Sequence, residues 1–194
     1  MDKVKIVAGE GDLILHLGGG SKWSVEIKVK KIHIHPGYKH AFGKKVKITW
    51  DLAMIEVKSK IPVEDNPKID FALLPSPGLT SVGAQVKVGG WGKTSQYSGS
   101  SPDHLVINVA INSGEKCLES YTPDEYDNEQ MLCIGDSSRT ACQGDSGGSA
   151  ILQEDNKPVI LGVLSFGNKQ CKKPAVFQRI EKSLSWILGI TNIR

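Results

Sequence analysis

The 194-residue sequence has no apolar run that approaches the roughly 20 residues needed to cross a bilayer. Long helical periodicity and internal repeats are also missing. The formal net charge is only +3, and lysines such as Lys28, Lys30 and Lys31 follow strand-like segments without interleaved aromatic residues. This pattern indicates a solvated strand face. We therefore expect neither a membrane nor a nucleic acid as a partner.

Export signals and metal-ligand spacings are missing too. Met1 to Lys5 lead directly into strand-like sequence, without the apolar segment and small-residue cleavage site of a signal peptide. No cysteines are paired at zinc-ligand spacing, so we expect no metal and no cofactor. Four cysteines allow two disulfides, which form in oxidising compartments. We expect a secreted, extracellular protein whose signal peptide lies outside this sequence.

Short segments in which apolar and polar residues alternate predict β-strands, separated by turns rich in glycine, serine, asparagine and proline. The alternation of residues 25–29 changes phase at Ile32, which predicts a β-bulge near Lys30 and Lys31. Further strands are expected at residues 52–57, 105–111 and 159–164.

Only the C-terminus looks helical, because Ile180, Leu184 and Ile187 fall on one helix face. A proline-containing stretch, residues 61–77, separates the strands into an N-terminal and a C-terminal group. The sequence therefore predicts an all-β chain with one short helix and an interdomain crossing.

The most informative segment is residues 142–148, Cys-Gln-Gly-Asp-Ser-Gly-Gly. A serine hydroxyl is a good nucleophile only after a base removes its proton, and backbone N–H groups stabilise the oxyanion of acyl transfer. Glycines around Ser146 allow unusual backbone conformations and a close approach of a substrate carbonyl. Alone, the segment is also compatible with a plain glycine turn.

Other short motifs of the sequence occur in the same order as in a known protein family. The chain resembles the chymotrypsin/trypsin-like serine endopeptidases, and the resemblance covers nearly the whole sequence. Its landmarks are residues 35–38, 50–55, 89–92, 142–148, 165–167, 174–177 and 179–190.

This resemblance implies a fold of two antiparallel six-stranded β-barrels with the active site between them. The first barrel would be incomplete, with unpaired edges and exposed apolar residues. Residues 1–75 would form its remnant and the crossing. Residues 76–194 would form the second barrel and the C-terminal helix, and both parts together would be one peptidase domain. The resemblance also pairs Cys117 with Cys133 and Cys142 with Cys171.

The resemblance assigns roles as well. Ser146 would be the nucleophile, and Asp51 would orient a base histidine. The N–H groups of Gly144 and Ser146 would form the oxyanion hole. Asp145 would pair with the amine that zymogen cleavage releases. Without that amine, the Asp145 carboxylate needs a shifted pKa or another donor.

The partner would be a polypeptide substrate or a protein inhibitor. The implied substrate-binding residues are Thr140, Gln143, Ser165, Phe166, Gly167 and Ala175. Thr140 stands at the position that forms the floor of the family's specificity pocket, and it carries no charge. The methyl group of Ala175 would narrow the wall of that pocket. We therefore expect an apolar or modest-sized side chain to be preferred.

One element of the family is absent, namely the Ala-His-Cys-like segment that carries the base. None of the five histidines, His16, His33, His35, His40 and His104, lies in such a motif. Our hypothesis is an N-terminally truncated serine endopeptidase, a hydrolase that is inactive as this chain alone. The alternative is a non-catalytic serine protease homologue that acts as a binding or regulatory protein. The retained Ser146, Asp51, Gly144 and Asp145 favour the enzyme, because a long-inactive site has no chemical need for all of them.

Overall fold

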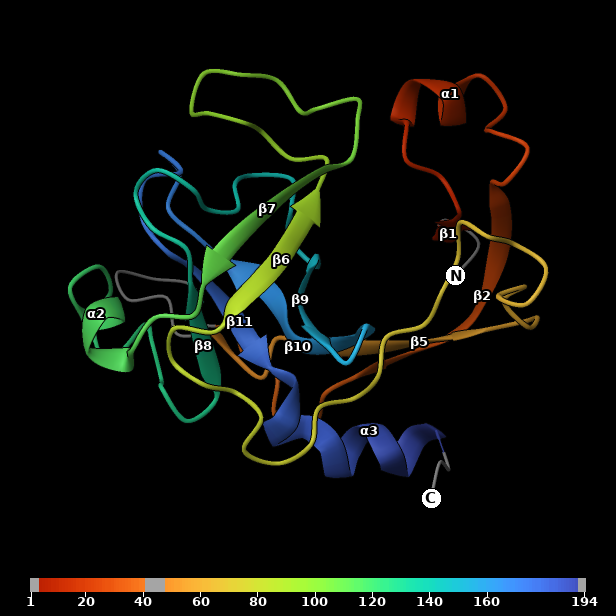
Figure 1. The fold of residues 1–194 in the computed structure, drawn as a ribbon. Helices are drawn as coiled ribbons and strands as arrows, with labels where there is room; N and C mark the ends of the chain where they lie inside the picture. The colour runs from red at the N-terminus through yellow and green to blue at the C-terminus, as the bar shows by residue number, and fades with distance from the viewer. Residues whose placement is uncertain (1–3, 41–47, 192–194) are drawn as a thin grey trace.

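The N-terminal part of the chain forms an open antiparallel sheet. The computed structural model describes residues 4–40 and 48–191 (Figure 1). Strands β1 (Lys5–Ala8), β2 (Val25–Ile34) and β5 (Ala53–Val57) lie in the order β1-β2-β5. The register of β2 against β5 shifts between Val29 and Lys31, so the bulge expected at this point is confirmed. A smaller ribbon pairs β3 (Lys39–His40) with β4 (Ile48–Thr49).

The C-terminal part forms a curled sheet of six strands, ordered β7-β6-β9-β10-β11-β8. The strands are β6 (Gln85–Gly90), β7 (Leu105–Ala110), β8 (Met131–Ile134), β9 (Ser149–Glu154), β10 (Lys157–Phe166) and β11 (Ala175–Arg179). An antiparallel bridge between Ile111 and Ile134 joins the two ends of this sheet. The side chains that the sheet encloses, among them Leu161 and Phe177, are fully buried.

The expected C-terminal helix is present as a 3-10 turn (Ile180–Ser183) followed by α3 (Leu184–Thr191). Two further short helices, α1 (Leu13–Leu17) and α2 (Gly114–Leu118), contradict the expectation that only the C-terminus is helical. Each has five residues, too few to show a periodicity, and begins at a side-chain cap, Asp12 or Ser113. None of the helices in the described ranges is long and apolar enough to span a membrane.

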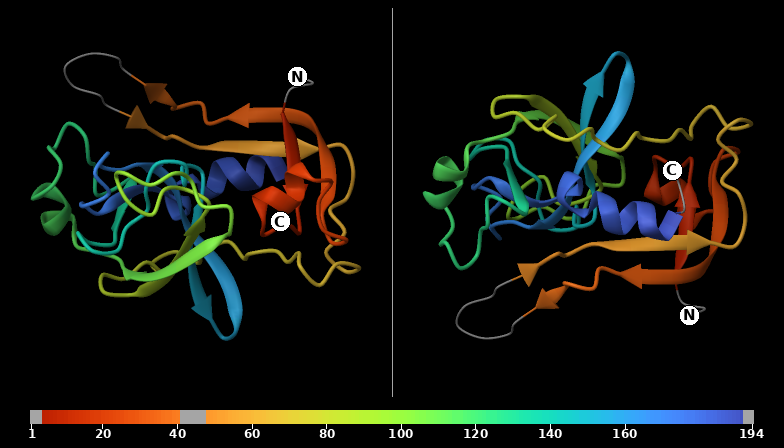
Figure 2. Two further views of the ribbon diagram at one scale, coloured as in Figure 1. Left: turned by 90° about the horizontal axis from the view of Figure 1, so that it is seen from above. Right: turned by 90° about the horizontal axis from the view of Figure 1, so that it is seen from below.

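The helix α3 joins the two sheets. Buried Leu52, Ile180 and Ile187 form one apolar cluster, which brings the start of β5 against the C-terminal helix. Figure 2 shows α3 running beside the long strands of the N-terminal sheet. The crossing between the two parts is held at Leu73, whose N–H donates to the Pro158 carbonyl. The division of the chain at residue 75 remains a prediction.

The N-terminal sheet has two strand edges without a partner among the described residues, one on β1 and one on β5. Large apolar side chains on β2 and β5 are exposed, with Ile34 at 62% and Ile55 at 45%. The fold is thus all-β, as expected, with an open three-stranded sheet, a curled six-stranded sheet and a short C-terminal helix.

Candidate functional site

The loop that carries Ser146 precedes β9 and is shaped by backbone hydrogen bonds within the loop and to β10. The Gly147 N–H donates to the Leu164 carbonyl, and the Gly148 N–H donates to the Asp145 carbonyl. Gly144 and Gly147 have φ values of 98° and 84°, which favour glycine. A side chain at Gly148 would place its Cβ 2.8 Å from the Asp145 carbonyl oxygen. The loop therefore needs its glycines and presents Ser146 at an exposed turn.

The backbone N–H groups of Gly144 and Ser146 have no hydrogen-bond partner within the part of the chain that the structure describes. The Ser146 hydroxyl also has none there. The structure thus brings to one turn two amides and a hydroxyl that have no partner among the described residues. Their roles as oxyanion hole and nucleophile remain predictions.

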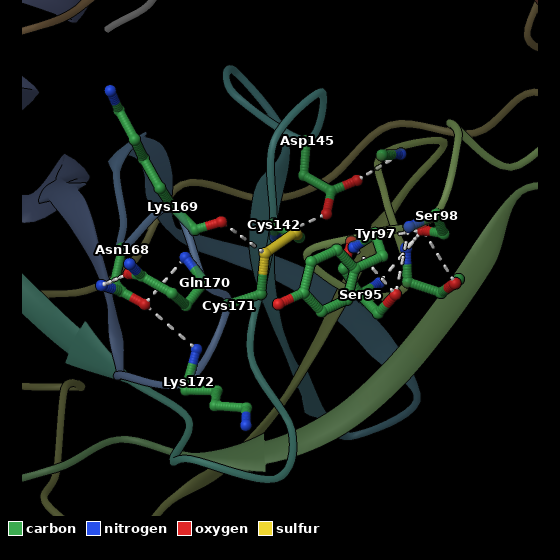
Figure 3. The surroundings of a disulfide bond; sticks show 12 residues. Ser95, Tyr97, Ser98, Cys142, Asp145, Asn168, Lys169, Gln170, Cys171 and Lys172 are labelled. Carbon is green, nitrogen blue, oxygen red and sulfur yellow. Dashed lines mark hydrogen bonds between the residues drawn. A yellow bond between two sulfur atoms is a disulfide. The ribbon is translucent and has the colours of Figure 1, made fainter.

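The Asp145 carboxylate is satisfied by backbone donors. Its Oδ1 accepts a hydrogen bond from the Gly92 N–H at 2.7 Å, and its Oδ2 accepts one from the Cys142 N–H at 2.9 Å. Figure 3 shows these contacts beside the Cys142–Cys171 disulfide. A Cβ at Gly92 would lie 2.5 Å from Oδ1, so only glycine lets the backbone approach the carboxylate. Asp145 has therefore found another donor.

Asp51 lies between β4 and β5 and contacts the C-terminal sheet. Its Oδ2 accepts a hydrogen bond from the Ser165 hydroxyl at 2.7 Å. The preceding Trp50 stacks on His35 with 4.7 Å between ring centroids, and His35 also meets Trp186 of α3 edge to face. Burial lowers the pKa of His35 below its usual value. His35 thus fixes the aspartate segment against α3.

Asp51 and Ser146 line the same cavity, which has a volume of about 580 Å³. Its remaining walls are mainly apolar and include Ile34, Ile55 and Leu164. No histidine is among the lining residues in the described ranges. Asp51 and Ser146 therefore line a common space to which the described residues contribute no imidazole.

Two of the other histidines are held by contacts elsewhere. His33 Nε2 lies 3.2 Å from a carboxylate oxygen of Glu56 on the paired strand. His104 packs on Trp91 with 4.5 Å between ring centroids. Neither contact involves the residues around Asp51 and Ser146.

A second cavity, of about 280 Å³, is also lined by Ser146. Four of the residues expected to bind substrate line it, namely Gln143, Ser165, Phe166 and Gly167. Asn168 and Lys169 also line this cavity, and no signal in the sequence had singled them out. The Lys169 side chain points away from the disulfide in Figure 3.

Thr140 and Ala175 do not line that cavity. Ala175 is fully buried. A Cβ added at Gly167 would lie 3.8 Å from the Ala175 Cβ. Thr140 lines a neighbouring cavity of about 180 Å³ together with Asp145. The Thr140 hydroxyl is buried there and has no hydrogen-bond partner in the described part of the chain. A role of either residue in specificity remains a prediction.

Both expected disulfides, Cys117–Cys133 and Cys142–Cys171, are present. The first lies in a buried cluster with Tyr121. The second ties the loop of Ser146 to the segment after β10. Disulfide pairing, unlike the site roles, is thus confirmed.

Comparisons with known proteins give a consistent result. The family model described as Trypsin matches residues 2–187. Trypsin-1 of Astacus astacus is 28% identical over 189 residues, which are 95% of this chain and 74% of the relative. Glandular kallikrein-10 of Rattus norvegicus is 30% identical over 165 residues, with 79% of this chain and 60% of the relative covered. The clotting factor G beta subunit of Tachypleus tridentatus is 26% identical over 221 residues, covering 98% and 69%.

Proposed function

The chain belongs to the trypsin family of serine proteases, and from this premise we propose that it is the peptidase domain of a serine endopeptidase that acts on polypeptides through Ser146. One observation carries the proposal. Asp51, whose carboxylate accepts a hydrogen bond from the Ser165 hydroxyl, lines the same cavity as Ser146.

The proposed reaction is acyl transfer. The Ser146 oxygen attacks the carbonyl carbon of a peptide bond, and a base takes the hydroxyl proton. The N–H groups of Gly144 and Ser146 then bind the oxyanion, and this role is supported by their lack of partners among the described residues. Asp51 orients the base and stabilises its protonated form. Water afterwards releases the acyl group and restores the serine.

We also propose that this chain alone has no measurable peptidase activity, because no described residue places an imidazole in the shared cavity. Loss of the base in a serine protease costs roughly a millionfold in turnover. This factor corresponds to about 8 kcal/mol of transition-state stabilisation.

Reaction with a fluorophosphonate tests both parts. Peptide mapping should find the adduct on Ser146 and not on Ser165 or Ser149, with a rate far below that of an active serine protease. A typical active rate would contradict the proposed inactivity. A preferred adduct on another serine would contradict the role of Ser146.

The proposed specificity is for an apolar or modest-sized side chain. Gln143, Phe166 and Gly167 line the cavity beside Ser146 and carry no charge, and Thr140 offers none. The test measures the affinity for an inhibitor peptide with an extended loop. The peptide is varied at the residue that enters this cavity. Leucine or alanine should bind more tightly than lysine or arginine, and the reverse order would contradict this preference.

The alternative role is that of a non-catalytic homologue that binds or regulates other proteins. The observation that favours it is the cavity without an imidazole. Tight inhibitor-peptide binding without any reaction at Ser146 would support this alternative. For either role, the two disulfides support an extracellular location.

A further inference from the structure

A third large cavity lies beside helix α2 and has a volume of about 620 Å³. This volume falls within the range of about 300–1,000 Å³ that is usual for ligand pockets. The cavity shares no lining residue with the two cavities that Ser146 lines. Figures 1 and 2 show α2 on the side of the C-terminal sheet that faces away from the N-terminal sheet. The cavity is therefore separate from the candidate catalytic site.

Two side chains that line this cavity, Arg179 and Thr80, carry buried donors without an acceptor. The Arg179 Nη2 donates to the carbonyls of Asn128 at 3.1 Å and Met131 at 3.2 Å, which holds that end of the guanidinium in place. Its Nε–H and the Thr80 hydroxyl have no hydrogen-bond partner in the described part of the chain. A buried donor without an acceptor costs free energy. Both donors therefore favour a ligand that supplies acceptor oxygens.

The charges around the cavity match a ligand with a single negative charge. Arg179 is the only basic residue among the described residues that line it, and none of the ion pairs between described residues involves Arg179. Burial raises the pKa of Tyr126 to about 12, so this lining residue stays neutral. The exposed Glu115 also lines the cavity and would repel a second negative charge. A carboxylate, which pairs strongly with a guanidinium, therefore fits better than a phosphate dianion.

Much of the remaining wall is apolar. Ile111 and Leu132 line the cavity and are buried, whereas Val82 and Leu118 line it and are 67% and 45% exposed. A hydrocarbon chain that covers the two exposed side chains removes apolar surface from water on both partners, which favours binding. The cavity therefore suits a ligand that joins one carboxylate to an apolar chain.

We propose that this cavity is a binding site for a small monocarboxylate with a hydrocarbon chain, of which octanoate is an example. The carboxylate accepts hydrogen bonds from the Arg179 Nε–H and the Thr80 hydroxyl, and the chain lies against Val82 and Leu118. Binding involves no covalent step. The inference goes beyond the proposed function, because Ser146 and the residues around it take no part in this site.

Isothermal titration calorimetry of the full chain with octanoate tests the proposal. We expect saturable binding of one octanoate per chain. 1-Octanol has the same chain length without a carboxylate and should bind at least about tenfold more weakly, because it loses hydrogen bonds between charged groups. Acetate keeps the carboxylate without the chain and should bind at least about 100-fold more weakly, because each buried CH₂ group contributes to the affinity.

Three variants locate the site. Thr80→Val replaces a hydroxyl that has no partner among the described residues by a methyl group, so it should not lower the unfolding temperature, yet it should weaken octanoate binding by about tenfold. Leu118→Glu adds a negative charge at a position that is 45% exposed, so it should fold and lose binding. The matched control is Leu188→Glu on α3, at a position outside the cavity that is 38% exposed, and it should leave the affinity unchanged.

Several results would overturn the proposal. Octanoate that shows no saturable binding would do so, and so would equal affinities for octanoate and 1-octanol. Full affinity in folded Thr80→Val or in folded Leu118→Glu would place the ligand elsewhere and would also overturn it. None of these results bears on the reaction of Ser146 with a fluorophosphonate, so the proposed function is tested independently.

Discussion

Replacement of Gly92 by alanine should displace the Asp145 carboxylate. The new Cβ would lie 2.5 Å from Oδ1 and 2.6 Å from Cγ of Asp145, closer than real Cβ contacts allow. Gly92 does not have a positive φ, so its backbone accepts alanine and the effect is steric. The carboxylate must move away from the Gly92 and Cys142 N–H groups, which now donate to it at 2.7 and 2.9 Å.

The expected cost follows from these two hydrogen bonds. Hydrogen bonds to charged groups contribute about 1.5–3 kcal/mol each. Asp145 is only partly buried, so water replaces part of the loss. The lower entropy of the unfolded alanine chain returns about 0.4–1 kcal/mol. We expect Gly92→Ala to lower the free energy of unfolding by about 2–4 kcal/mol.

Urea unfolding under non-reducing conditions measures this change. With an m-value near the upper end of about 1–3 kcal/mol/M, the midpoint should fall by about 1 M. The matched control is Gly99→Ala in the same loop region, because a Cβ there meets nothing within 4 Å. It should be neutral or slightly stabilising.

A double-mutant cycle with Asp145→Ala isolates the contact. If Gly92→Ala acts through the carboxylate, its cost should shrink by about 1 kcal/mol or more in the Asp145→Ala background. The reasoning is refuted if Gly92→Ala and Gly99→Ala differ by less than about 0.5 kcal/mol. Equal costs in both backgrounds would also refute it.

Further predictions concern the core, a disulfide and pH. Phe177→Ala empties a fully buried position and should lower the free energy of unfolding in urea by about 3–5 kcal/mol. The control Phe71→Ala, at a site that is 64% exposed, should change it by no more than about 0.5 kcal/mol. Similar losses for both variants would contradict the assigned core. Replacement of Cys117 and Cys133 by serine opens a 16-residue separation and should cost about 3 kcal/mol, and a loss below about 1 kcal/mol would contradict this. Burial and the nearby negative charge of Glu125 raise the pKa of Tyr121 to about 12. Its neutral form is favoured in the folded state, so stability should fall as pH rises from about 10 toward 12. Tyr121→Phe should lack this part of the slope, and identical pH profiles would contradict the assignment.

Much of the fold could be predicted because it depends on local patterns. The phase change at Ile32 located the bulge of β2, and Ile180 and Ile187 located the C-terminal helix. Helix α1 (Leu13–Leu17) was missed, since five residues with an aspartate cap carry no periodic signal. Local patterns therefore located the longer elements and missed a short capped one.

The candidate site, like the fold, could be predicted from the sequence only in part. The glycine positions around Ser146 were informative because the backbone there adopts positive φ at Gly144 and Gly147. The location of Thr140 beside Asp145 could not be read from the chain. It depends on how the loops pack on each other, which no spacing encodes.

The sequence by itself determined the residue types around Ser146, because local backbone requirements fix them, while the family and the cysteine pairs followed from the resemblance of its motifs to a known family. Tertiary structure alone decided which donors satisfy Asp145, that Ser165 holds Asp51, and that Asp51 and Ser146 share a cavity. The physical reason is that these contacts join segments between 53 and 114 positions apart, except for the local Cys142 donor. The pairing of β6 with β9 brings Gly92 to Asp145, and the packing of the N-terminal segment on the C-terminal sheet brings Asp51 to Ser165.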